Sequence, residues 1–154
     1  MTNHTAESNF VYVTFIRTTP DRLWQALTEP DFMREYWFGV HLQTEWKPGS
    51  SWEMIHPDGR VTDAGEVLEF DPPKRMVLAW RHELRPELKA EGLARCTIEL
   101  QPESDAVKLT ITHHIDHPAS KLIEAVSWGW PRILSNLKSF LETGQIVLNM
   151  KKPA

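Results

Sequence analysis

The chain has 154 residues, of which 41% are apolar and 25% charged, and its formal net charge is −4. These values are typical of one folded domain and argue against a nucleic-acid partner, because binding to phosphates favours a basic surface. Residues 1–9 lack the apolar core of a signal peptide, and no apolar run approaches the roughly 20 residues that span a bilayer, so a cytoplasmic protein without membrane insertion is expected.

The first part of the chain predicts a strand followed by two short helices. Residues 10–17 are rich in β-branched and aromatic side chains, which favours a strand. Thr19 and Pro20 then provide a hydroxyl cap and a first-turn proline for a helix. Pro30 ends this helix and can begin a second one that runs to about Tyr36.

Six strands in a meander are predicted next, because alternating apolar residues are interrupted by short turns. Their expected ranges are 41–46, 51–56, 60–70, 74–83, 95–101 and 106–115. Gly65 marks either a bulge or a point of close approach, and residues 84–92 are predicted to form a loop. The single cysteine, Cys96, cannot form an internal disulfide and is expected to be a small core residue.

The last long element is predicted to be an amphipathic helix. A helical region is expected from Ser120, and Gly144 is placed to end the helix as a left-handed residue. Since proline is tolerated near a helix start, Pro131 predicts that the regular part begins between Ser127 and Trp130. One face carries the apolar residues Trp130, Ile133, Leu134, Leu137, Phe140 and Leu141.

A helix of this kind is expected to pack across an antiparallel sheet, and alternation identifies the face that it covers. Three strands contribute the candidate inner-face residues Trp52, Met54, His56, Met76, Leu78, Trp80, Leu109, Ile111 and His113. Seven tryptophans are the unusual feature of the composition. They fit either a bulky core or a cavity with aromatic walls.

Several motifs in this order resemble the bacterial homologues of the heat-shock-protein ATPase activator, a family of the START-like (SRPBCC) superfamily. The resemblance is carried by residues 19–28, 36–39, 48–52, 65–73, 75–80, 109–113 and 129–144. It implies an α+β helix-grip fold: a curved antiparallel sheet of six or seven strands around a long C-terminal helix, with a cavity between them. The expected organisation is an N-terminal tail (1–9), one START-like domain (10–144) and a C-terminal tail (145–154).

The leading functional hypothesis is that a small hydrophobic or aromatic molecule binds in this cavity. The predicted wall residues are Trp37, Trp52, Met54, Leu78, Trp80, Ile111, His113, Trp130 and Leu134. His113 would orient the ligand, although a lone histidine on an apolar face also fits a hydrogen-bonded core residue. Trp37 and Phe38 are expected at the cavity mouth, where they would gate entry or cap the core.

Two alternatives remain open from the sequence. One is a cyclase- or hydrolase-like enzyme that uses His113 as acid or base. The other is a chaperone-linked interaction module with an exposed apolar patch near Trp46 or Trp128. No cofactor is expected, and no metal either, because His113 and His114 should point to opposite faces of their strand. The chain is expected to be a monomer or a homodimer.

Overall fold

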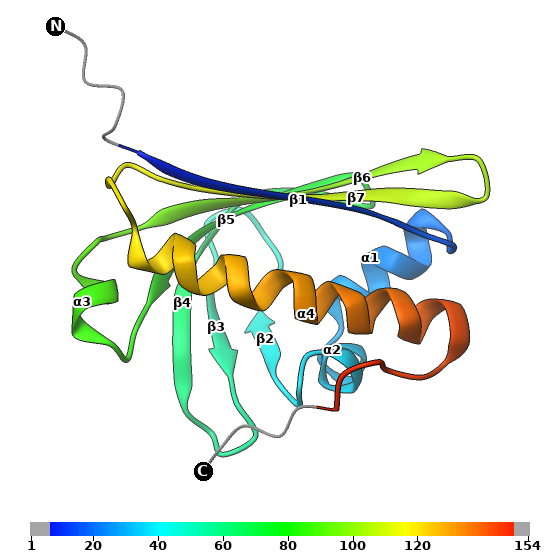
Figure 1. Cartoon of the computed structure of the whole chain (residues 1–154), viewed down its shortest axis with the longest axis horizontal. Helices are drawn as coiled ribbons and strands as arrows, with labels where there is room; N and C mark the ends of the chain where they lie inside the picture. Colours follow the sequence, from blue (N-terminus) through cyan, green and yellow to red (C-terminus); the bar gives the residue numbers. More distant parts are fainter. Residues whose placement is uncertain (1–6, 150–154) are drawn as a thin grey trace, which may run out of the picture.

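The computed structural model describes residues 7–149 and shows a single antiparallel sheet covered on one face by a long helix (Figure 1). The sheet has seven strands in the order β1-β7-β6-β5-β4-β3-β2. The strands are β1 (Ser8–Ile16), β2 (His41–Thr44), β3 (Ser51–Ile55), β4 (Val61–Asp71), β5 (Arg75–His82), β6 (Ala94–Glu103) and β7 (Ala106–Ile115). The helices are α1 (Pro20–Thr28), α2 (Pro30–Tyr36), α3 (Pro86–Lys89) and α4 (Lys121–Thr143). The predicted helix-grip fold is therefore confirmed.

The inner face of the sheet is the one predicted from alternation. Because directly paired residues of antiparallel strands share a face, the register aligns Val67, Leu78, Cys96 and His113 in one row. All four are fully buried. Two rows further along this face, Met54 lies opposite Asp63, and Asp63 lies opposite His82. The sheet thus presents an apolar surface with polar residues concentrated towards the ends of β3, β4 and β5.

Gly65 is a point of close approach and not a bulge. A Cβ atom at this position would lie 1.7 Å from the carbonyl oxygen of Ala79 and 2.9 Å from Trp52 Nε1. The space left by glycine allows the indole of Trp52 to cross β4 and donate a hydrogen bond of 2.9 Å to that same carbonyl. The register shifts lie elsewhere. The pairing of β3 with β4 shifts between Met54 and Ile55 of β3, and the pairing of β4 with β5 shifts between Val67 and Glu69 of β4.

Helix α4 is longer than predicted, because Pro131 lies inside it and not near its start. The helix begins at Lys121, where the Ser120 side chain accepts a hydrogen bond from the Ile123 amide. Glu91 adds a second cap, since its carboxylate accepts hydrogen bonds from the Lys121 amide at 2.8 Å and the Leu122 amide at 3.4 Å. These contacts, with the burial of Leu122 and Leu134, hold the helix on both sides of the proline. The cost of one missing backbone donor is therefore offset by capping and packing.

Smaller differences from prediction occur at the edges of elements. β1 begins at Ser8, two residues before the predicted strand, and the predicted loop at 84–92 contains the short helix α3. Of the predicted C-terminal tail, residues 145–149 turn back on α4, where the Asn136 amide oxygen accepts hydrogen bonds from the Val147 and Leu148 amides. The rest of that tail, and the first six residues of the predicted N-terminal tail, lie outside the described residues.

No helix among residues 7–149 is both long enough and apolar enough to cross a membrane.

Candidate ligand cavity

The space between α4 and the sheet is filled on one side and hollow on the other. Among the strands, α4 makes its most extensive contacts with β1 and far fewer with β3–β5. Beneath the middle of the helix, the rings of Trp80 and Trp130 lie 6.0 Å apart, and those of Trp52 and Trp80 lie 4.7 Å apart. The hollow begins beside these indoles and opens towards β3 and the loop after α2.

Two adjacent cavities make up this hollow. The first, which we call the inner chamber, has a volume of about 260 Å³, and the second, the outer groove, about 750 Å³. They share the wall residues Trp37, Met54, His56, Gly129 and Ile133. A Cβ atom at Gly129 would meet only Ile133 Cδ1 within 4 Å, at 3.9 Å. The absence of a side chain at this helix position therefore leaves space in a wall that both cavities share.

The outer groove is lined mainly by apolar side chains from four parts of the chain. Trp37 and Phe38 follow α2, Met54 and Pro57 come from β3 and the turn after it, Trp128 comes from α4, and Ile146 and Leu148 come from the C-terminal segment. Trp37 and Phe38 line this groove, and their predicted place at the cavity mouth stays a prediction. The amide of Asn136 fixes the C-terminal segment, because its nitrogen also donates a 2.8 Å hydrogen bond to the carbonyl of Leu148.

The inner chamber has a polar floor. Trp80 Nε1 donates a hydrogen bond of 2.7 Å to Asp63 Oδ2, and His82 Nδ1 lies 3.6 Å from the same oxygen. Next to them, His56 Nε2 and Thr62 Oγ1 are hydrogen-bonded at 2.9 Å. Burial alone would raise the pKa of Asp63, but the interactions with His82, Trp80 and Thr62 outweigh it and lower the pKa below its usual value. Asp63 is consequently ionised at neutral pH.

The predicted wall residues fall into two groups. Trp37, Met54, Trp80 and Trp130 line the inner chamber. The other five are buried in the core and do not line either cavity among the described residues: Trp52, Leu78, Ile111, His113 and Leu134. They support the wall from behind, since Trp52 and His113 pack directly against Trp80.

His113 occupies a fully buried position behind the indole wall. Its Nδ1 accepts a hydrogen bond of 3.1 Å from Trp130 Nε1, and its Nε2 has no partner within the part of the chain that the structure describes. Desolvation lowers the pKa of His113 to about 4 despite the nearby charge of Asp63, so the imidazole is neutral at pH 7. This geometry fits the hydrogen-bonded core residue that was one of the two interpretations, and it gives no support to an acid or base role.

Sequence reasoning did not assign four polar residues to the site: His56, Thr62, Asp63 and His82. His56 had been placed on the inner face, but without a role. The signal for the others was the strong turn at residues 57–59, which pairs β3 with β4 and brings Met54 opposite Asp63. From that register, a carboxylate on the inner face could have been inferred.

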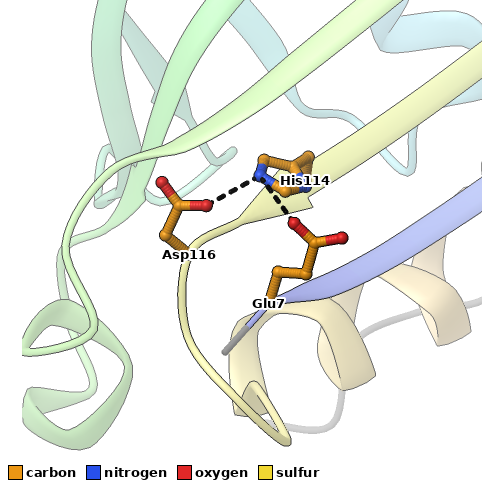
Figure 2. A group of neighbouring side chains, drawn as sticks. All are labelled: Glu7, His114 and Asp116. Atoms are coloured by element: carbon orange, nitrogen blue, oxygen red, sulfur yellow. Dashed lines mark hydrogen bonds and ion pairs between the residues drawn. The ribbon is translucent and has the colours of Figure 1, made fainter. Parts of the chain in front are cut away.

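A separate group of polar residues lies at the surface where β1 begins and β7 ends (Figure 2). His114 Nε2 lies 2.9 Å from Asp116 Oδ1 and 3.9 Å from Glu7 Oε2, and its Nδ1 lies 2.7 Å from Asn9 Oδ1. One ligand atom of each of the three residues Glu7, His114 and Asp116 falls within 4.8 Å of the others. Exposed ion pairs account for these distances, so we assign the group to surface electrostatics.

Comparison with known families gives one match. The model of the family described as "Activator of Hsp90 ATPase homolog 1-like protein" matches residues 17–142, which cover every element from α1 to α4. None of the curated proteins compared with the chain matches it.

Several solved structures share the fold. Protein MLL2253 from Mesorhizobium loti has a TM-score of 0.76 at 21% identity and covers 90% of this chain and 100% of its own. PFC0360w, described as an HSP90 activator from Plasmodium falciparum, has a TM-score of 0.71 at 22% identity, with 87% and 96% covered. The Aha1 dimer from Colwellia psychrerythraea has a TM-score of 0.70 at 20% identity, with 89% and 98% covered. At these identities the similarity concerns the fold.

Proposed function

The chain belongs to the activator of Hsp90 ATPase homolog 1-like family, and we propose that it uses this fold to bind a small hydrophobic or aromatic molecule between the sheet and α4. The observation that carries the proposal is the pair of adjacent cavities that share indole and aliphatic walls. Apolar pockets of this size are typical of small-molecule sites. Removing about 200 Å² of apolar ligand surface from water would gain about 5 kcal/mol before association costs.

Gly129 provides a direct test of this function. A leucine at this position would place its side chain in the space beside the wall that both cavities share, whereas alanine would add only one methyl group. The measurement is a fluorescence titration with N-phenyl-1-naphthylamine, a neutral probe that brightens in apolar surroundings. We expect saturable binding to the wild type and to Gly129→Ala, and at least about tenfold weaker binding to Gly129→Leu, which corresponds to about 1.4 kcal/mol.

The alanine variant is the matched control, because it keeps the cavity and should stabilise the helix by about 0.5–1 kcal/mol. Equal probe affinity for Gly129→Leu and Gly129→Ala, with both variants folded, would place the probe elsewhere and contradict the proposal.

A second candidate function is docking on an Hsp90-type chaperone. It is suggested by the family's description and by Trp128, which is 54% exposed in the area where an apolar patch was predicted. Stimulation of an Hsp90 ATPase that is lost in Trp128→Ala would support this function, and no stimulation would count against it. Formation of a homodimer also remains a proposal, and light scattering in solution would decide between one and two copies.

A further inference from the structure

The inner chamber is lined by one carboxylate and by no lysine or arginine among the described residues. The carboxylate is that of Asp63, whose side chain is 12% exposed. It is ionised at neutral pH because the hydrogen bonds around it outweigh its burial. A cation that entered the chamber would therefore be attracted to this carboxylate.

Two of the three indoles that line the chamber already use their N–H groups, since Trp80 donates to Asp63 and Trp130 donates to His113. His82 Nε2 is buried and has no hydrogen-bond partner within residues 7–149, so this atom is closed to a ligand in the chamber. The carboxylate of Asp63 is the acceptor that a hydrogen-bond donor on the ligand would meet.

The aromatic walls favour the same kind of ligand. Trp37, Trp80 and Trp130 line the inner chamber, and the face of an indole attracts cations. A ligand carboxylate would instead lie close to the charge of Asp63 in surroundings of low dielectric constant, where repulsion is strong. In the outer groove, the charged residues Arg34 and Glu35 carry opposite signs, so the groove favours neither cationic nor anionic ligands. The inner chamber is therefore the part that would select a ligand by its charge.

We propose that the ligand is an apolar molecule with a protonated amine, whose ammonium group lies against Asp63 while its apolar body extends past Gly129 into the outer groove. This inference rests on the proposed ligand-binding function and adds the chemical class of the ligand.

The test uses three probes with one body and different head groups: 1-naphthylmethylamine, 1-naphthalenemethanol and 1-naphthoate. Each is used to displace N-phenyl-1-naphthylamine from the wild-type protein. We expect the amine to bind about tenfold more tightly than the alcohol, and the carboxylate to bind most weakly. In Asp63→Asn, which retains an oxygen acceptor for Trp80, the amine should lose about tenfold in affinity, while the alcohol should change by less than about twofold.

The outcomes separate the two proposals. Binding of N-phenyl-1-naphthylamine without any preference for the amine would overturn the amine proposal and leave apolar ligand binding intact. If neither the probe nor any of the three compounds binds, both proposals fail. The ranking of the three compounds on the wild-type protein decides the question even if Asp63→Asn does not fold.

Discussion

At the scale of single residues, the contact between His113 and Trp130 explains why a histidine is tolerated in the core. An indole N–H can only donate, so the Nδ1 atom of His113 must accept, and the proton of the neutral ring resides on Nε2. The ring also packs edge-on against Trp80 at a centroid distance of 5.1 Å. His113 therefore positions two indoles that form the cavity wall.

This burial makes the stability of the fold sensitive to acid. The folded-state pKa of His113 is lowered to about 4, whereas the unfolded value is about 6.5, so the unfolded state gains a proton first as the pH falls. Stability is consequently lost between about pH 6.5 and pH 4, with about 2 kcal/mol lost between pH 7 and pH 5. We expect His113→Asn, which keeps an acceptor for Trp130, to lack this part of the loss of stability between pH 7 and pH 5. Urea unfolding of the wild type and the variant at both pH values would measure it. Equal losses of stability in the two proteins would show that His113 does not cause the acid sensitivity.

The sequence predicted which residues face the core. It did not predict which of them pack within the core and which line a cavity. Alternation identified Leu78, Ile111 and His113 as inward-facing, and all three are fully buried. Whether an inward side chain touches a cavity depends on the position of α4 above the sheet, which alternation does not encode. Asp63 was missed for another reason: charged side chains are rarely buried, so the residue type itself gives no signal for a place on the inner face.

At the scale of elements, the C-terminal segment after α4 completes the outer groove. Asn136 is fully buried in α4 and joins three parts of the chain through its amide. Its nitrogen lies 3.3 Å from the carbonyl of Tyr36 and 2.8 Å from that of Leu148, and its oxygen accepts from two backbone amides at 3.0 and 2.7 Å. One side chain thus positions the groove wall that contains Ile146 and Leu148.

Removal of this amide should release the segment. We expect Asn136→Ala to lower the free energy of unfolding by about 2 kcal/mol, because buried backbone groups lose their partners. Hydrogen exchange at the Val147 and Leu148 amides should accelerate more than exchange within the sheet. Ser139→Ala, a half-buried substitution in the same helix whose hydroxyl lies 3.5 Å from Thr143 Oγ1, is the control and should change neither quantity. Unchanged protection of the two amides in Asn136→Ala would show that other contacts hold the segment.

Elements with strong local signals were predicted well. Thr19, Pro20 and Pro30 gave the starts of α1 and α2, and Gly144 adopts the expected left-handed conformation at the end of α4. The helical region expected from Ser120 agrees with the observed start of α4, but the regular part of the helix was placed too late. The proline rule is local, whereas the caps at Ser120 and Glu91 involve contacts between distant parts of the chain. Helix α3 was missed because its four residues carry too little periodicity to detect.

At the scale of the whole molecule, the fold combines a packed half and a hollow half. α4 packs closely against β1, and the inner chamber lies beside β3, β4 and β5. The order of strands and helices was predictable from turns and alternation. The position and volume of the hollow were not, because they depend on how seven tryptophans pack and on the missing side chain at Gly129.

The tryptophans also allow the most direct test of the account, because each indole N–H gives its own signal in a ¹H–¹⁵N correlation spectrum. On saturation with N-phenyl-1-naphthylamine, we expect the signals of Trp37, Trp80 and Trp130 to shift, since these rings line the inner chamber. Trp24 and Trp46 pack against Phe70 away from the cavity and should keep their positions. Shifts confined to Trp24 and Trp46, or an unchanged spectrum at saturating probe, would contradict a ligand site beneath α4.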